Sequence, residues 1–382
     1  MRTALSRLIW LLLGGLAVLA ACEGILRLLP VSMGLYRTPQ FERWPLQNFE
    51  AHLPYAYSTT WAMLNAHRGT TNNYGHIAPF DYRRDSRPLL VIGDSYVESL
   101  MNDYADTLQG QLGRRLGAPG AVYGLGVSGL SASDYLALSR LARDEFRPAA
   151  AVFLITDGDL AESLSPRLGN YYLASDGGAL RLRYLPMQGE SLQKKLRKAV
   201  GDSALYRYLQ ANLHFSLDGL FKSSAAHAAQ PAAGSRAVQD GDLQRRVADW
   251  FLAELPGGLG LPPQCIVLLV DTDRYAIYSH AAAAPPKDLP ASRQYLIEQA
   301  RRLGFGVSDL DPVFRERYAR DGLKFDYWPL DRHWNRLGHA VGADEAYRLL
   351  FPDGATRCRP GAADGGPNAA RSGAQSGARD GA

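Results

Sequence analysis

The sequence predicts an α/β protein in which a parallel sheet is covered by helices on both faces. Five short apolar runs with little alternation are typical of strands buried on both sides. These runs are Leu89–Ile92, Ala121–Leu125, Ala149–Ile155, Ile266–Val270 and Val307–Leu310. Helix-like stretches stand between most of them, and right-handed crossovers leave few topologies for this alternation. In such sheets, sites form at the carboxyl ends of the strands.

Residues 1–30 predict a membrane anchor. Basic residues precede an uncharged run, Leu8–Cys22, and the apolar character continues past Glu23 to Pro30, enough for a tilted span of roughly 20 residues. We interpret this segment as a single-pass anchor in the inner (cytoplasmic) membrane, with the rest of the chain in the periplasm. Two alternatives stay open: a buried helix, or a lipoprotein signal, since Leu19–Cys22 resembles a lipobox in which Cys22 is lipidated after cleavage.

The chain after the anchor divides into three parts. Residues 31–87 have weak periodicity and are expected to wrap on the core domain, residues 88–353. Within that domain, Asp106 is the expected N-cap of a helix over Thr107–Leu116, and a second helix is expected over Ser133–Phe146. Residues 354–382 are Gly, Ala, Arg, Asp and Ser with few large apolar residues, which predicts a disordered tail.

An insertion over residues 161–261 interrupts the strand–helix pattern. Alternating residues on both sides of a Ser-Asp-Gly-Gly turn predict a hairpin over Tyr171–Tyr184. A helical stretch over Ser191–Phe215 and a mobile linker over Lys222–Asp240 follow. Because the insertion follows the carboxyl end of the third strand, it is either a lid that affects substrate choice or a solvated insertion without a role in binding.

Composition excludes some classes of function. The net charge is +4, but the Arg residues are scattered and form no basic stripe, so a nucleic-acid partner is not expected. The three cysteines, Cys22, Cys265 and Cys358, contain no CxxC pair, which excludes a zinc ribbon. A bridge between Cys265 and Cys358 is possible but does not follow from their spacing, and we interpret Cys265 as a small core residue.

Ser95 is the candidate nucleophile. The first strand is followed directly by Gly93-Asp94-Ser95-Tyr96. A serine at a tight strand-to-helix turn presents its hydroxyl at the mouth of the sheet, where backbone N–H groups point at a developing anion. A Gly-Asp-Ser turn also occurs by chance in many loops, so a second element is needed.

That second element is Asp331-Arg332-His333 near the end of the folded region. A serine hydroxyl is inert at neutral pH until a base removes its proton, and an acceptor must hold the base in one tautomer. His333 is the expected base and Asp331 the expected acceptor. His339 lies six residues after His333, which is not helical i, i+4 spacing, so a zinc site is not expected and His339 is interpreted as a packing or capping residue.

These blocks resemble the SGNH family of esterases and acyltransferases, also called the GDSL hydrolases. The resemblance covers roughly Asn73 to Leu350 without the insertion, and rests on Gly93–Tyr96, on Gly124–Gly129 after the second strand, and on Asp331–Asn335. It implies a three-layer α/β/α fold with five parallel strands. It also implies an oxyanion hole formed by the N–H groups of Ser95 and Gly129.

One block departs from the family pattern. Where the family has Gly-x-Asn-Asp after the third strand, with an Asn that donates to the oxyanion, this chain has Thr156-Asp157-Gly158-Asp159. Gly158 falls on the Asn position, and a shift by one residue brings only Asp157, whose carboxylate repels an oxyanion unless it is protonated. Loss of one donor typically costs about 10²–10³ in rate. Asp271–Asp273 follows the fourth strand and is interpreted as loop capping.

The sequence thus predicts a serine esterase or deacetylase that acts outside the cytoplasm without a cofactor or metal. The expected substrate is an acyl ester or an acylated carbohydrate. An O-acyltransferase is the alternative, because the anchor and the Asp-x-His-Trp block resemble SGNH domains that acetylate exopolysaccharides with a membrane partner as acyl donor. A second alternative is a binding or assembly protein that keeps the fold without catalysis.

Overall fold

The computed structural model describes residues 2–35, 37–39, 46–186, 201–215, 241–279, 291–352 and Cys358. Its core is a five-stranded parallel sheet in the order β11-β10-β7-β5-β6, as the sequence predicts. The strands are β5 (Leu89–Gly93), β6 (Val122–Gly126), β7 (Ala150–Ile155), β10 (Ile266–Val270) and β11 (Gly306–Asp309). Each lies within one residue of its predicted run, because a continuous apolar stretch between helices is stable only where both faces of the strand are buried.

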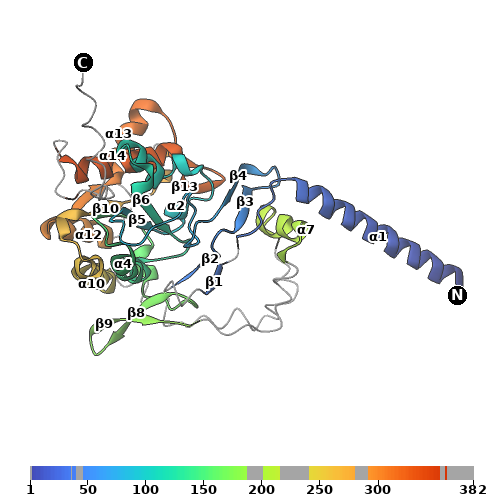
Figure 1. Cartoon of the computed structure of the whole chain (residues 1–382), viewed down its shortest axis with the longest axis horizontal. Helices are drawn as coiled ribbons and strands as arrows, with labels where there is room; N and C mark the ends of the chain where they lie inside the picture. Colours follow the sequence, from blue (N-terminus) through green and yellow to red (C-terminus); the bar gives the residue numbers. More distant parts are fainter. Residues whose placement is uncertain are drawn as a thin grey trace, which may run out of the picture.

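Helices cover both faces of the sheet, which makes three layers (Figure 1). Every residue of β5, β6, β7 and β10 is buried. One face carries α4 (Ala132–Phe146), α10 (Gly241–Leu259) and α12 (Ala291–Arg302), of which α10 contacts both others. The other carries α3 (Leu108–Arg115) and α14 (Arg336–Leu350). α10 falls within the predicted 161–261 insertion, yet it packs on α4 and α12 as part of a covering layer.

The helix starts follow from side-chain capping. The Thr107 side chain accepts a hydrogen bond from the Gly110 N–H at 3.2 Å and begins α3. The prediction of Asp106 as this N-cap was wrong, because Asp106 ends a preceding 3-10 turn, Tyr104–Asp106, and the threonine hydroxyl reaches the free N–H groups. A capping box of Ser131 and Asp134 begins α4.

Shorter elements surround the sheet. Those beside its carboxyl edge are α2 (Ser95–Glu98), α5 (Asp159–Glu162), α11 (Arg274–Tyr278), α13 (Leu310–Asp321), β12 (Asp326–Tyr327) and β13 (Asp331–Trp334). β8 (Tyr171–Asp176) and β9 (Ala179–Tyr184) form the predicted hairpin. The N-terminal part forms two antiparallel pairs, β1 (Arg37–Pro39) with β2 (Gln47–Phe49), and β3 (Pro54–Thr59) with β4 (Leu64–Thr70).

Parts of the predicted insertion and tail lie outside the described residues. Of the helical stretch Ser191–Phe215, residues 201–215 are described and hold α7 (Ala204–Arg207) and a π-helical turn, η3 (Tyr208–Asn212). The Lys222–Asp240 linker lies outside them, as does nearly all of the 354–382 tail.

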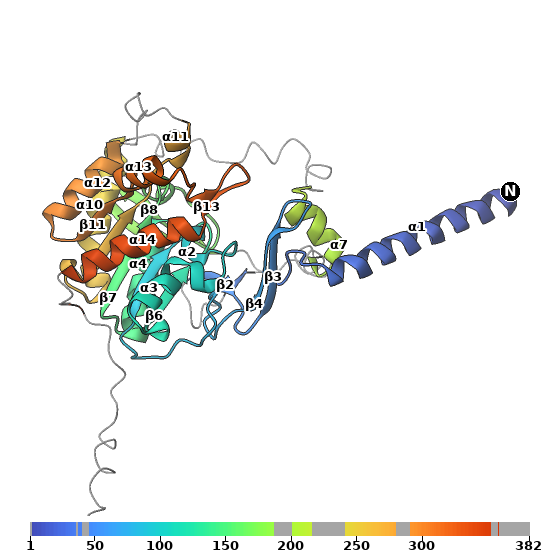
Figure 2. The same ribbon diagram turned by 90° about the horizontal axis from the view of Figure 1, so that it is seen from above.

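The N-terminal helix α1 (Arg2–Leu28) projects from the body of the molecule (Figures 1 and 2). Within it, Thr3–Leu28 is long and apolar enough to cross a membrane, and none of its most apolar stretch is buried. A signal sequence has the same character, so the structure establishes an apolar helix and the spanning role stays a prediction.

Cys265 and Cys358 form a disulfide with a Cα–Cα distance of 5.7 Å. The interpretation of Cys265 as a plain core residue was therefore incomplete: it is buried, and it is also bonded. The two cysteines are 93 residues apart, and they meet because α14, which packs on β10 and β11, ends close to the amino end of β10. This long-range meeting has no signature in the local sequence.

Candidate active site

Ser95 is the first residue of α2, two residues after β5 ends at Gly93. The side chain of Asp94 accepts a hydrogen bond from the Tyr96 N–H at 3.0 Å and so caps α2. α2 lies directly against β6, because a Cβ on Gly126 would overlap the backbone nitrogen of Glu98. The close approach at Gly126 therefore fixes the turn that holds Ser95 at the carboxyl edge of the sheet.

The structure brings the three residues of the predicted triad together in one hydrogen-bonded chain. His333 Nε2 lies 2.7 Å from Ser95 Oγ, and His333 Nδ1 lies 2.6 Å from Asp331 Oδ1. The His333 backbone N–H also donates to Asp331 Oδ1 at 3.0 Å. His333 and Asp331 lie on β13, a strand 238 residues beyond Ser95. This is the arrangement in which a base removes the proton of a nucleophilic serine.

The surroundings of Asp331 and His333 fix the charge of the carboxyl group and the orientation of the imidazole ring. Burial alone would raise the pKa of Asp331, but the hydrogen bonds and charge of His333 outweigh it and hold that pKa below its ordinary value. Asp331 is therefore ionised at neutral pH and accepts a hydrogen bond from the Nδ1–H group. The Tyr96 ring packs 4.8 Å from the His333 ring, which restricts its orientation. The two side chains are 28% (His333) and 18% (Asp331) exposed, so a substrate can reach the base.

The predicted oxyanion loop is tied to the Ser95 turn. Gly129 follows β6 with φ +81°, a conformation that favours glycine. Two residues earlier, the Val127 N–H donates to the Gly93 carbonyl at 3.4 Å. The Ser128 N–H donates at 2.8 Å to the buried carboxylate of Glu98, at the far end of α2. Gly129 is thus held on a segment that is bonded to both sides of Ser95.

The departing third block lies at the carboxyl end of β7. Asp157 and Gly158 line a cavity there, and no Asn occupies either position. Burial, reinforced by the negative charge of Asp271, raises the pKa of Asp157 to about 6, while Arg293 at 3.8 Å opposes the shift. At neutral pH, Asp157 is therefore mainly a carboxylate and a poor donor to an oxyanion.

The cavity measures about 350 Å³ and lies over the carboxyl ends of β7 and β10. It is bounded by the chain neighbours of the triad, Tyr96 and Arg332, and its wall is rich in charged groups and aromatic rings. The Tyr275 and Trp328 rings lie 4.9 Å apart at 50° on this wall. The remaining lining residues are Thr156, Asp157, Gly158, Asp271, Thr272, Asp273, Arg274 and Asp326.

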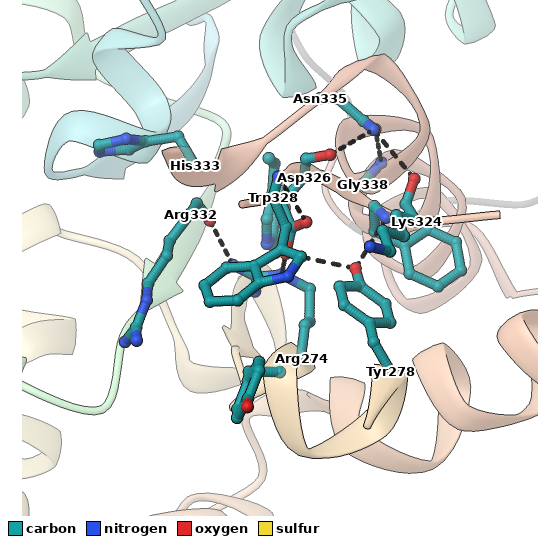
Figure 3. A network of polar contacts seen from close by, with 12 residues as sticks. Arg274, Tyr278, Lys324, Asp326, Trp328, Arg332, His333, Asn335 and Gly338 are labelled. Atoms are coloured by element: carbon teal, nitrogen blue, oxygen red, sulfur yellow. Dashed lines mark hydrogen bonds and ion pairs between the residues drawn. The ribbon is translucent and has the colours of Figure 1, made fainter. Parts of the chain in front are cut away.

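Arg274 connects the cavity to the triad (Figure 3). Its guanidinium is 4% exposed and forms ion pairs with Asp271 at 2.5 Å and Asp326 at 3.0 Å. The same group donates to the Arg332 carbonyl at 2.6 Å and to the Tyr96 hydroxyl at 3.1 Å. Because Arg332 precedes the base and Tyr96 follows the nucleophile, one buried side chain supports both.

Sequence reasoning missed Arg274 and gave only part of the role of the Asp271–Asp273 segment. Asp273 caps α11, accepting from the Tyr275 N–H at 3.0 Å, which confirms loop capping. Asp271 instead forms the buried ion pair with Arg274. The available signal was an Arg three residues after an Asp at the end of a buried strand, where an unpaired carboxylate would be costly.

Asn170, from the insertion, was also missed. Its side-chain amide donates to the Gly129 carbonyl at 3.4 Å and to the Asp134 carboxylate at 3.1 Å. The insertion therefore contributes a side chain beside the predicted oxyanion loop. Asn170 lies 41 residues after Gly129 in the sequence, and no local pattern connects the two.

His339 is buried in the core, as a packing residue. The Leu108 N–H donates to its Nδ1 at 3.1 Å, so Nε2 carries the proton and donates to Ser99 Oγ at 2.9 Å. Burial, with the charges of His333 and Arg274, lowers the pKa of His339 to about 3. Within the described ranges, no group of three or more His, Cys, Asp or Glu side chains could hold a metal ion.

No protein-family model and no curated protein matches the chain. Among solved structures, it is similar to an alpha/beta hydrolase enzyme from the metagenome of Lake Arreo, Spain, at 14% identity and a TM-score of 0.35, over 70% of this chain and 96% of that one. It is also similar to TesA at 15% identity and a TM-score of 0.32, over 69% and 98% of the two chains. At these identities and TM-scores, neither similarity carries an argument about function.

Proposed function

We propose that this protein is an extracytoplasmic serine hydrolase that cleaves carboxylic esters through an acyl-enzyme. The observation that carries the proposal is the hydrogen-bonded chain from Asp331 through His333 to Ser95 at the carboxyl end of β5. Packing alone does not require this chain of hydrogen bonds, because His333 is partly exposed and its two ring nitrogens bond to Ser95 and Asp331. The resemblance to the SGNH family points to the same three residues.

The proposed reaction has two halves. Ser95 Oγ attacks the ester carbonyl while His333 Nε2 takes the hydroxyl proton, and Asp331 stabilises the resulting imidazolium through Nδ1–H. The N–H groups of Ser95 and Gly129 stabilise the oxyanion. The C–O bond to the alcohol then breaks, and His333 returns the proton to the leaving alcohol. In the second half, water attacks the acyl-enzyme with His333 again as base, which releases the acid and restores Ser95.

The cavity supports a hydroxyl-rich substrate, an acylated carbohydrate. Sugars present hydroxyl groups to carboxylates and guanidinium groups, and their C–H faces pack on aromatic rings. The cavity offers Asp273 and Arg332 together with the Tyr275–Trp328 ring pair. A long acyl chain would instead need a predominantly apolar pocket.

The same cavity keeps an O-acyltransferase as the second candidate. A polar cavity of about 350 Å³ beside the triad has room for a hydroxyl-bearing acceptor, which would replace water in the second half of the reaction. A membrane partner that delivers the acyl group belongs to this alternative. Hydrolase and transferase differ only in what attacks the acyl-enzyme.

Two features support a location outside the cytoplasm. The Cys265–Cys358 disulfide is typical of an oxidising compartment, and α1 is suited to anchor the chain in the inner membrane with the domain in the periplasm. Lipidation at Cys22 is the alternative form of anchoring, and it places the domain on the same side.

The test uses the full chain in lipid nanodiscs with 4-nitrophenyl acetate, alone and with an oligosaccharide. Release of nitrophenolate that disappears in Ser95→Ala but persists in Ser175→Ala, an exposed serine near the end of β8, supports the proposal. Acetylated oligosaccharide in the mass spectrum would favour the transferase. Equal release by the wild type and Ser95→Ala would contradict both enzymes and favour a binding or assembly protein.

A further inference from the structure

Two segments from distant parts of the chain cover the base of α1. The Glu23 carboxylate, on α1, accepts hydrogen bonds from Ser203 Oγ at 2.7 Å, the Ala204 N–H at 3.0 Å and the Leu205 N–H at 2.9 Å. α7 therefore begins on α1 itself. The β3–β4 hairpin lies beside α7 in both views (Figures 1 and 2).

The covering begins at a specific height along α1. Residues 3–21 are exposed throughout, and Cys22 and Glu23 are the first pair to be partly covered. Within that stretch, the uncharged run after Arg7, Leu8–Ala21, is about 21 Å long at 1.5 Å per residue, which leaves the partly covered residues at the domain end of a roughly 30 Å hydrocarbon core. With α1 as the span, the protein cover starts near the membrane interface on the domain side.

Buried hydrogen bonds lock these segments to the exit of α1. Ser58 Oγ donates to the Pro30 carbonyl at 2.6 Å, and Ser32 Oγ donates to the Ser58 carbonyl at 2.8 Å. Asn212 Nδ2, from η3, donates to Ser58 Oγ at 2.8 Å. Ser32, Ser58 and Asn212 are at most 4% exposed, so α1 continues into the domain through a packed joint.

This joint carries large apolar side chains that stay partly or largely exposed in the described part of the chain. Trp61 and Leu64, at the β3–β4 turn, are 74% and 44% exposed, and Leu213 and Phe215, after η3, are 42% and 49% exposed. The Tyr208 hydroxyl donates to the Trp61 carbonyl at 2.9 Å. Tyr208 is five residues after Ser203, whose hydroxyl donates to Glu23 on α1, so the contact with Trp61 lies only about 8 Å of helix from the base of α1.

We propose that Trp61, Leu64, Leu213 and Phe215 form a collar that inserts into the interfacial layer of the leaflet from which α1 emerges. The occupant is lipid because the collar is continuous with the apolar helix that brings it to the bilayer, and Trp prefers this depth. The collar takes the same position if Cys22 is lipidated instead, since Cys22 would then lie at the membrane surface.

The collar also sets the position of the triad. β4, which Leu64 begins, carries His67, whose Nε2 lies 2.9 Å from the Met101 carbonyl, and the Tyr327 hydroxyl donates to the same carbonyl at 2.9 Å. Tyr327, on β12, is paired with Asp331 on β13. One hairpin therefore extends from the collar to the surroundings of Asp331, and docking of the collar holds the site in one orientation above the membrane.

The test places an environment-sensitive fluorophore on single cysteines in the full chain, reconstituted in vesicles of phosphatidylcholine and phosphatidylglycerol. Cys22→Ser removes the free thiol, and Cys265 and Cys358 are joined in their disulfide. Labels at Trp61→Cys and Phe215→Cys are compared with a label at Leu303→Cys, a 47% exposed position on the α12–β11 turn. Near-ultraviolet circular dichroism that matches the parent chain establishes that each variant is folded.

The expected result is that lipid-borne nitroxide quenches the labels at 61 and 215 several-fold more strongly than the label at 303, while aqueous iodide shows the reverse order. Iodide quenching that is equal at all three positions would overturn the proposal, because the collar would then lie in water. Protection of 61 and 215 from both quenchers would also overturn it, because a protein and not lipid would cover the collar.

Discussion

The carboxyl edge of the sheet has two halves that are built on different principles. Over β5 and β6, Ser95 and the β13 pair Asp331 and His333 form a partly exposed chain of directed hydrogen bonds. Over β7 and β10, the cavity wall is dominated by charge, with Asp157 where an oxyanion donor is expected and Arg274 buried between carboxylates. The first half has the geometry for chemistry, and the second provides shape, charge and support.

The two halves are joined through Arg274. Its bonds to the Arg332 carbonyl and the Tyr96 hydroxyl reach across from the β10 side to the neighbours of the base and the nucleophile. The two halves therefore differ in construction, but they are not structurally independent of each other. Substitutions in the triad should affect chemistry far more than stability, whereas substitutions of Arg274 should affect stability and chemistry together.

The largest expected effect is a contrast in kcat between Asp→Asn substitutions made in the two halves. Asp331→Asn should lower kcat by about 10⁴, because His333 loses the acceptor that fixes its tautomer. Asp157→Asn, the matched control, should leave kcat at or above the wild-type value at pH 7.5. The measurement is ester hydrolysis under saturating substrate. Comparable losses in the two variants would break the division between a catalytic and a supporting half.

The second prediction concerns Arg274. Arg274→Ala should lower the free energy of unfolding by about 3–5 kcal/mol, because Asp271 and Asp326 are left buried without their partner. Arg332→Ala, which removes an exposed guanidinium from the same cavity, should change it by less than about 0.5 kcal/mol. Urea unfolding followed by circular dichroism measures both. Equal stability of the two variants would remove Arg274 from its proposed connecting role.

A third prediction restores the missing donor. Gly158→Asn should raise kcat by up to about 10², the value of one oxyanion donor. The position has an ordinary φ of −83°, and an added Cβ would meet only the movable end of the Glu162 side chain. Gly158→Ala is the control for the added Cβ. A rise that is equal in the two variants would point to backbone effects, and no rise in Gly158→Asn would mean that this position does not face the oxyanion.

The smallest predicted effect is a difference in pH dependence. The pKa of Asp157 is about 6 in the folded protein, above its ordinary value of 3.8, so its contribution to stability is present below pH 3.8 and is lost as the pH rises through about 6. Asp157→Asn should therefore raise the free energy of unfolding at pH 7.5 and leave it nearly unchanged at pH 4.

The pKa of Asp331 is shifted in the opposite direction. Its pKa is lowered in the folded protein, so its contribution to stability is present above the ordinary pKa and is lost as the pH falls. Asp331→Asn should therefore lower the free energy of unfolding at pH 7.5 by more than it does at pH 3. Thermal unfolding of both variants across this range is the measurement, and parallel curves for the two would contradict the assigned shifts.

The sequence predicted the sheet because its strands are continuous apolar runs that can hardly lie elsewhere. It also pointed to Ser95, Asp331 and His333, since a serine turn after the first strand and an Asp-x-His block near the end of the domain each carry a local pattern. Their meeting across 238 residues came from the family resemblance. The structure adds the hydrogen-bond distances between Asp331 and His333 and between His333 and Ser95.

Other features depend on contacts between distant residues that no local pattern reveals. The Cys265–Cys358 bridge required the end of α14 to lie near β10, and Asn170 reaches Gly129 only through the fold of the insertion. Glu23 looked like an interruption of the apolar N-terminus, yet its carboxylate caps α7. Propensity and spacing contain no information on such partners, because these are set by tertiary packing.

The central claim is that His333 activates Ser95, and a fluorophosphonate probe tests it most directly. The full chain in nanodiscs is incubated with the probe, and its intact mass is measured beside Ser95→Ala and His333→Ala. The account predicts a single adduct in the wild type, none in Ser95→Ala and a strongly slowed adduct in His333→Ala. A folded wild type without an adduct, or an adduct that persists in Ser95→Ala, would contradict it.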